Sequence, residues 1–182
     1  MGKSIGMAEY KTVSAGIFAA DAMVKTAEVN IIEAQTVCPG KYIIIIEGEL
    51  SAVRAAVDTA KNTYPEQLID NFVLGNPDPS IFPAIYGVTN VEELKALGII
   101  ETYDASAIIV AADMAAKTAE VKLIEIRLAR GMCGKSYLMI TGEVSAVTAA
   151  IERAKSVVQT DGMYLDSSVI ARPDAKICKA IL

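Results

Sequence analysis

Residues 5–33 read IGMAEYKTVSAGIFAADAMVKTAEVNIIE, and residues 97–125 read LGIIETYDASAIIVAADMAAKTAEVKLIE. The two stretches align without a gap and are identical at 15 of 29 positions. After a shift of two residues, residues 40–61 align with residues 134–155, and 12 of 22 positions are identical. The chain therefore carries one unit twice, and we expect function to depend on the places where the two copies differ.

A third match extends the repeat, because VLGNPD at 73–78 aligns with VIARPD at 169–174. The chain has 182 residues, which is enough for two compact units near the small end of domain size. We predict a first domain at residues 1–90 and a second at residues 91–182. Units of this size bury a limited core, so each is expected to pack against its twin or against another subunit.

The composition excludes several classes of function. There is no histidine, which removes Ser-His-Asp and Cys-His catalysis and imidazole metal sites. No other residues indicate bond-making catalysis, and we predict that the protein is not an enzyme. The net charge of −5, without a basic stripe, argues against nucleic acid as a partner. No long uncharged apolar run predicts a membrane span. Three widely spaced cysteines predict no disulfide framework and a cytoplasmic location.

Each copy shows the same predicted order of elements: strand, helix, strand, strand, helix, strand. In the first copy we expect strands at 4–10, 30–37, 42–50 and 71–75, helices at 14–29 and from Ser51, and a short terminal helix at 80–86. Ser51 is a favourable N-cap residue. The inner face of its helix is predicted to comprise Val53, Ala56, Val57 and Ala60. The order is that of the split βαβ, or ferredoxin-like, α+β fold.

The first helix of each copy repeats a second pattern. Apolar residues at spacings of three and four place one face of the first helix at Val13, Ile17, Ala20, Val24 and Ala27. Away from that face, Asp21 and Lys25 are one turn apart and can form an ion pair. Asp113 and Lys117 repeat this arrangement in the second copy.

Several stretches resemble the bacterial microcompartment shell family, whose members tile the protein coats around certain metabolic enzymes. These stretches are DAMVKTAEV at 21–29, VCPGK at 37–41, GELSAVRAAVDTA at 48–60 and VIARPD at 169–174. Both copies look unpermuted, as in the tandem-domain shell proteins of propanediol-type compartments. The resemblance implies two tandem shell domains, a homotrimer that is a pseudo-hexamer, and packing with other shell proteins in a planar sheet.

The resemblance also implies which residues line a central pore and which lie at the edge of a tile. The pore-lining residues would be Val37, Pro39, Gly40 and Lys41 in the first copy and Arg130, Gly131, Met132, Cys133 and Gly134 in the second. The edge residues would be Lys25, Lys117 and Arg172, with Asn76 at the position of Arg172 in the first copy.

Cys38 carries the sharpest hypothesis. One cysteine cannot hold an iron–sulfur cluster, but a three-fold axis through the pore loops would bring three Cys38 thiolates together. The resemblance to cluster-bearing relatives favours one [4Fe–4S] cluster per trimer with three protein thiolate ligands. Such a tile would pass electrons to encapsulated redox enzymes or deliver an intact cluster. The residues alone favour a different interpretation, in which Cys38 is a small apolar loop residue.

Other interpretations stay open. A cluster-free pore could conduct small metabolites, with Arg127, Arg130 and Lys41 setting its selectivity. A protein of another class, a ligand-sensing regulator, could also be built from tandem ferredoxin-like units, since the fold alone does not define function. Cys133 could add thiolates near the axis or be incidental, and Cys178 is expected to be unreactive.

Overall fold

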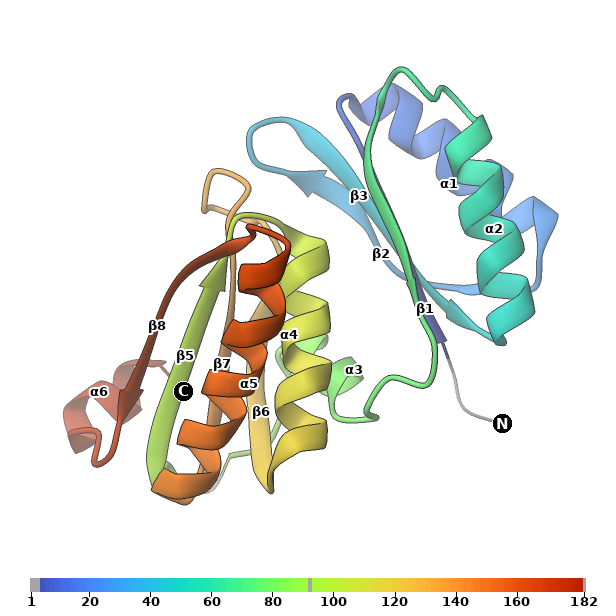
Figure 1. Ribbon diagram of the computed structural model, residues 1–182. Coiled ribbons are helices and arrows are strands. Elements are labelled where there is room, and N and C mark those ends of the chain that lie inside the picture. The colour runs from blue at the N-terminus through green and yellow to red at the C-terminus, as the bar shows by residue number, and fades with distance from the viewer. Residues whose placement is uncertain (1–3, 92, 182) are drawn as a thin grey trace. The chain divides into compact units, whose positions relative to one another are not determined.

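The computed structural model describes residues 4–91 and 93–181 (Figure 1). The chain forms two compact units, and the division between them falls after Pro77. By the repeat, residues 78–90 belong to the first copy, yet their contacts place them in the second unit. The compact units and the sequence copies therefore do not have the same boundary.

The first unit is an antiparallel four-stranded sheet with two helices. Its elements are β1 (Ser4–Tyr10), α1 (Val13–Thr26), β2 (Asn30–Val37), β3 (Lys41–Gly48), α2 (Leu50–Asn62) and β4 (Leu68–Leu74). The strands lie in the order β2-β3-β1-β4, and each neighbouring pair is antiparallel. This is the ferredoxin-like topology that the order of elements predicts.

The second unit repeats the sheet and adds a short helix at each end. Its elements are α3 (Ile81–Tyr86), β5 (Ala96–Thr102), α4 (Ala105–Thr118), β6 (Val121–Arg127), β7 (Ser136–Gly142), α5 (Val144–Thr160), β8 (Tyr164–Ile170) and α6 (Ala175–Ile181). The strand order β6-β7-β5-β8 matches that of the first unit. The predicted α+β class with two tandem, unpermuted units is confirmed.

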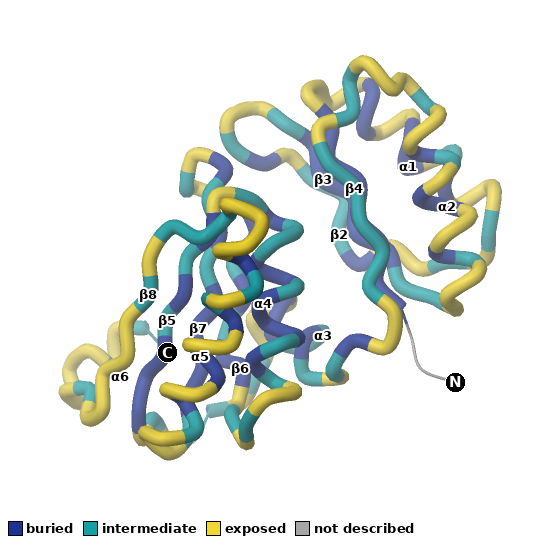
Figure 2. Tube along the Cα trace, in the orientation of Figure 1, coloured by how far each residue is buried: buried dark blue, intermediate teal, exposed yellow. Residues whose placement is uncertain are grey.

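In each unit the two long helices pack on one face of the sheet. The buried core lies between the helices and the sheet (Figure 2). The predicted inner face of α2 is confirmed, because all four of its apolar residues are fully buried. Gly6 of β1 permits this close packing, since a Cβ atom there would lie 2.7 Å from a methyl carbon of Val53. Gly98 of β5 has the same role beside Val147 of α5, again at 2.7 Å.

Helix α1 differs from the prediction. Val13, Ile17 and Val24, on the face selected by periodicity, are exposed by 37%, 53% and 39%. The residues that face the core are mostly smaller: Ala15, Gly16, Ala19, Ala20 and Met23. Ala20 of the periodic face is buried and Ala27 packs against the core, so the prediction holds for these two residues only. The helix is apolar on both sides, and hydrophobic spacing alone therefore does not identify the side that faces the sheet. It also ends at Thr26, three residues before the predicted end.

The two units differ in how the first helix packs on the sheet, and the structure differs from the prediction in the residue that caps α2. Gly16 of α1 lies directly over Tyr42 of β3, where an added Cβ atom would come within 2.5 Å of the ring. At the equivalent positions the second unit has Ile108 and Ser136, both fully buried. The predicted N-cap Ser51 lies inside α2, and Glu49 occupies the cap position without a side-chain hydrogen bond.

Candidate functional site

The loop between β2 and β3, residues 38–40, is a tight turn that carries Cys38. The Gly40 N–H donates to the Val37 carbonyl at 2.9 Å, and Gly40 has φ +102°, a conformation that suits glycine. Val37 is buried and Cys38 is half-buried, and the Cys38–Pro39 peptide is cis. The cysteine therefore lies on a turn held by its own backbone.

An ion pair ties this loop to the sheet. Lys41 Nζ lies 2.6 Å from Glu9 Oε1, and the Glu9 side chain is only 2% exposed. The pair joins the end of the loop to β1, so the charge of Lys41 is directed into the fold. This contact is not among those that the sequence predicts. The signal that could have found it is the recurrence of a glutamate, Glu9 and Glu101, in an otherwise mostly apolar first strand.

Replacing Lys41 with methionine is expected to destabilise the first unit by about 3 kcal/mol, because it leaves the buried Glu9 carboxylate without its cation. Denaturant unfolding would measure the loss. The double variant Lys41→Met with Glu9→Gln removes the buried charge as well, and it should recover much of the stability. A Lys41→Met protein as stable as the parent would show that the pair does not anchor the loop.

The equivalent loop of the second unit, residues 128–135, is longer and more contorted. Ala129 and Cys133 have φ values of +51° and +54°, which non-glycine residues seldom adopt. The Ala129 N–H donates to the Ser136 hydroxyl at 3.1 Å. Of the predicted pore residues in this loop, Arg130, Gly131 and Cys133 are exposed, Met132 is half-buried and Gly134 is buried. Cys133 thus lies on the surface of its unit.

Arg127, before this loop, is engaged in its own unit. Its Nε donates to Glu125 Oε1 at 2.7 Å, and its guanidinium carbon lies 5.7 Å from the centre of the Tyr137 ring. This hydrogen bond, which Arg127 donates to the Glu125 carboxylate, raises the pKa of Arg127. Lys41, bound to Glu9, and Arg127, bound to Glu125, are therefore both paired with carboxylates of their own units.

The predicted helix ion pairs are confirmed in both units. Lys25 lies 2.6 Å from Asp21, and Lys117 lies 2.7 Å from Asp113. The two pairs differ in environment, because the Asp21 side chain is 58% exposed and that of Asp113 only 5%. The other predicted edge residues, Asn76 and Arg172, are exposed.

Across residues 4–91 and 93–181, no three side chains of His, Cys, Asp or Glu come together as a metal site. An iron–sulfur cluster would therefore need thiolates from more than one copy of the chain. No helix in the same residues is long and apolar enough to cross a bilayer.

Comparison with known proteins identifies the two units. The family model described as the BMC domain matches residues 4–77 and again residues 96–173. The chain belongs to the BMC-domain family. Its two BMC domains correspond to the two ferredoxin-like sheets, and the linking segment with α3 lies between the matched ranges.

Relatives match the tandem arrangement over nearly its whole length. Bacterial microcompartment shell protein PduT of Citrobacter freundii is 38% identical over 173 residues, which cover 95% of this chain and 94% of PduT. A crystal structure of a microcompartment protein from Desulfitobacterium hafniense DCB superposes with a TM-score of 0.94 at 41% identity, covering 98% and 99% of the two chains. The fused permuted hexameric shell protein MSM0275, with a TM-score of 0.65 at 21% identity, shares the fold.

Proposed function

We propose that the protein is a structural tile of a bacterial microcompartment shell. Two complete BMC domains support this function, as does full-length similarity to PduT, a microcompartment shell protein. The tile would be a homotrimer, and therefore a pseudo-hexamer, lying among other shell proteins in a planar sheet. Lys25, Lys117 and Arg172 would contact neighbouring tiles, and Asn76 would make the corresponding edges of the first domain different.

A [4Fe–4S] cluster at the three-fold axis is the finer part of the proposal. The observation that carries it is the position of Cys38, a half-buried thiol on a turn anchored by the Lys41–Glu9 ion pair. A thiolate is the ligand that such clusters require, and three copies would supply three of them. Cys38 would hold the cluster, and the turn would fix the direction of the sulfur. Such a cluster, when bound, supplies one-electron transfer.

This function implies either electron transfer across the shell to encapsulated redox enzymes or delivery of an intact cluster. An open pore for metabolites is the weaker alternative. Two of the side chains that would give such a pore its selectivity, Lys41 and Arg127, are bound to Glu9 and Glu125. Their charges are therefore largely neutralised before any metabolite approaches.

Anaerobic purification followed by iron and sulfide analysis tests the cluster. We expect about four iron atoms per three chains, a broad visible absorption and a reduced-state electron paramagnetic resonance signal. Iron-free protein with all three thiols per chain still titratable after anaerobic reconstitution would remove the cluster and leave only the shell tile.

A further inference from the structure

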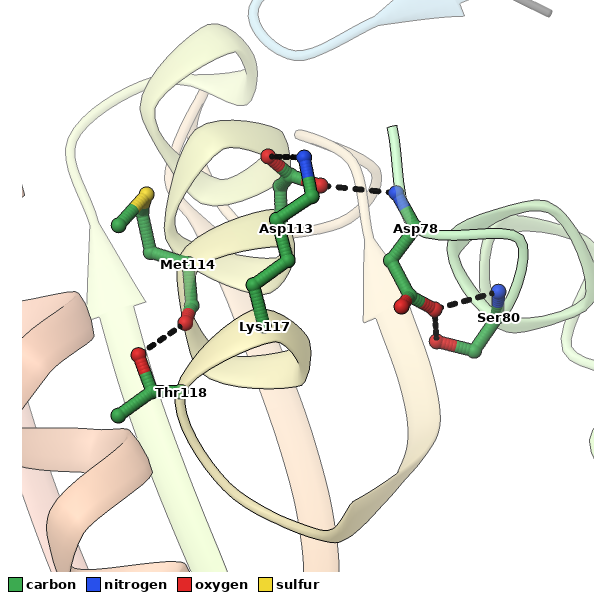
Figure 3. A network of polar contacts seen from close by, with 6 residues as sticks. All are labelled: Asp78, Ser80, Asp113, Met114, Lys117 and Thr118. Atoms are coloured by element: carbon green, nitrogen blue, oxygen red, sulfur yellow. Dashed lines mark hydrogen bonds and ion pairs between the residues drawn. The ribbon is translucent and has the colours of Figure 1, made fainter. Parts of the chain in front are cut away.

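Helix α3 packs within the second unit through an apolar face, and a backbone N–H just before the helix donates a hydrogen bond to a carboxylate of α4. Its buried residues are Ile81, Ala84 and Ile85, and it packs against β6 and α4. The Asp78 N–H, just before the helix, donates to Asp113 Oδ1 at 2.8 Å, while Asp113 Oδ2 binds Lys117 (Figure 3). Asp113 thus joins the incoming segment to the ion pair of α4.

Helix α6 is the counterpart of α3 at the end of the second copy. Asp174 aligns with Asp78, so the residues that align with the buried face of α3 are Ile177, Ala180 and Ile181. The local turn is also alike, since each aspartate accepts from the N–H two residues later. Yet none of the described residues of α6 is buried, and Ile177 is 51% exposed. Ile181 is half-buried against Leu97, Ile124 and Met139.

The surface of the first unit that corresponds to the α3 docking site is also open. Asp21 and Ile31 align with Asp113 and Leu123. Ile31 is 45% exposed, whereas Leu123 is fully buried. The aspartates show the same difference, because the Asp21 side chain is 58% exposed and that of Asp113 only 5%. We call Ile17, Asp21, Val24 and Ile31 the first-unit seat. Its three apolar members, Ile17, Val24 and Ile31, are all exposed.

Helix α6 and the first-unit seat are therefore both exposed within one chain. The docking of α3 on β6 and α4 shows how a helix of this kind packs on a surface of this kind. In the second unit, α6 follows β8, which is the edge strand opposite β6. A contact between one end of a chain and the other end of the next is head-to-tail, and such contacts form closed rings when the rotation allows it.

We propose that α6 of one copy docks on the first-unit seat of a second copy, with the Asp21 carboxylate accepting the N–H of Asp174 of the next copy. Ile177 would pack near Ile31, as α3 packs on β6. The proposal rests on the homotrimer described above and deepens it, because it names the surfaces that close the ring. The occupant is a second copy of this chain, since the helix that fits the seat by repeat alignment is the chain's own.

Sedimentation of Ile177→Glu tests the apolar part of the contact. Because Ile177 is already exposed within one chain, the variant should fold normally and sediment as a monomer at concentrations where the parent is a ring. Val88→Glu is the matched control, since Val88 is also exposed, at 68%, but lies outside α6 and the seat. It should keep the mass of the parent.

A pair of aspartate variants tests the polar part. Asp21→Ala should raise the dissociation constant of the ring about tenfold or more, because it removes a charge-assisted hydrogen bond between copies. Asp113→Ala is the matched variant, because the hydrogen bond that it removes, from the Asp78 N–H, lies within one chain. It should lower the unfolding temperature of the second unit and leave the dissociation constant unchanged.

The outcomes separate this inference from the function on which it rests. A parent protein that stays monomeric at high concentration would contradict the proposed homotrimer itself. A parent that forms a trimer and an Ile177→Glu variant that forms the same trimer with the same dissociation constant overturn the α6 contact alone. A ring of another stoichiometry that Ile177→Glu disperses supports the contact and contradicts the trimer.

Discussion

Replacing Cys38 with serine is expected to abolish the iron content and the visible absorption of anaerobically purified protein while leaving the oligomer intact. Serine has nearly the same shape, so the turn closed by the Gly40–Val37 hydrogen bond should persist. What is lost is the soft thiolate, and with it all three protein ligands of the proposed cluster at once, since the trimer repeats the change three times. The effect should therefore be a complete loss of the cluster.

The other two cysteines provide matched controls. Cys178 lies in α6, where its sulfur approaches the Pro173 carbonyl at 3.8 Å, and Cys133 is exposed in the loop between β6 and β7. Cys178→Ser and Cys133→Ser should both keep the iron. Iron retained by Cys38→Ser would mean that the wrong ligand was chosen, and iron lost only from Cys133→Ser would move the site to the second loop.

Replacing Gly16 with isoleucine should produce a large loss of stability in the first unit. A Cβ atom at this position would lie 2.5 Å from the Tyr42 ring, and isoleucine adds three more carbons in a fully packed interior. We expect the free energy of unfolding of the first unit to fall by about 3 kcal/mol, at the upper end for overpacked cores. Denaturant unfolding followed by far-ultraviolet circular dichroism would measure it.

The second unit indicates how to rescue this variant. At the equivalent positions it carries Ile108 and Ser136, so the large residue lies on the helix and the small one on the strand. The double variant Gly16→Ile with Tyr42→Ser copies that arrangement and should regain about half of the lost stability, although the Tyr42 hydrogen bond to the Ala34 carbonyl is gone. A double variant less stable than both single variants would show that the two cores pack differently.

The architecture could be predicted because the repeat identifies its own elements. The bounds of β1 and β2 agree with the prediction residue for residue, since alternating and β-branched patterns identify strands well. The end of α1 and the cap of α2 were predicted less well. Helix ends depend on local hydrogen bonds that several neighbouring residues can make.

The candidate site could be located in part. The motif placed Cys38 in the loop between the second and third strands, and the structure has it there. The partner of Lys41 could not be predicted by spacing. Glu9 and Lys41 come together only because the antiparallel register sets Glu9 opposite Ile43, two residues along β3. Such pairings depend on tertiary structure, which hydrophobic periodicity does not encode.

The docking of α3 on β6 has a consequence for how such a ring responds to dilution. Because α3 and the surface that receives it belong to one polypeptide, that junction forms as the chain folds and does not depend on protein concentration. In the proposed ring, each chain would therefore bring one helix already docked, and only the α6 contact would depend on concentration. A ring of separate single-domain subunits must instead form every junction by collision, so the tandem chain should complete its ring at lower abundance.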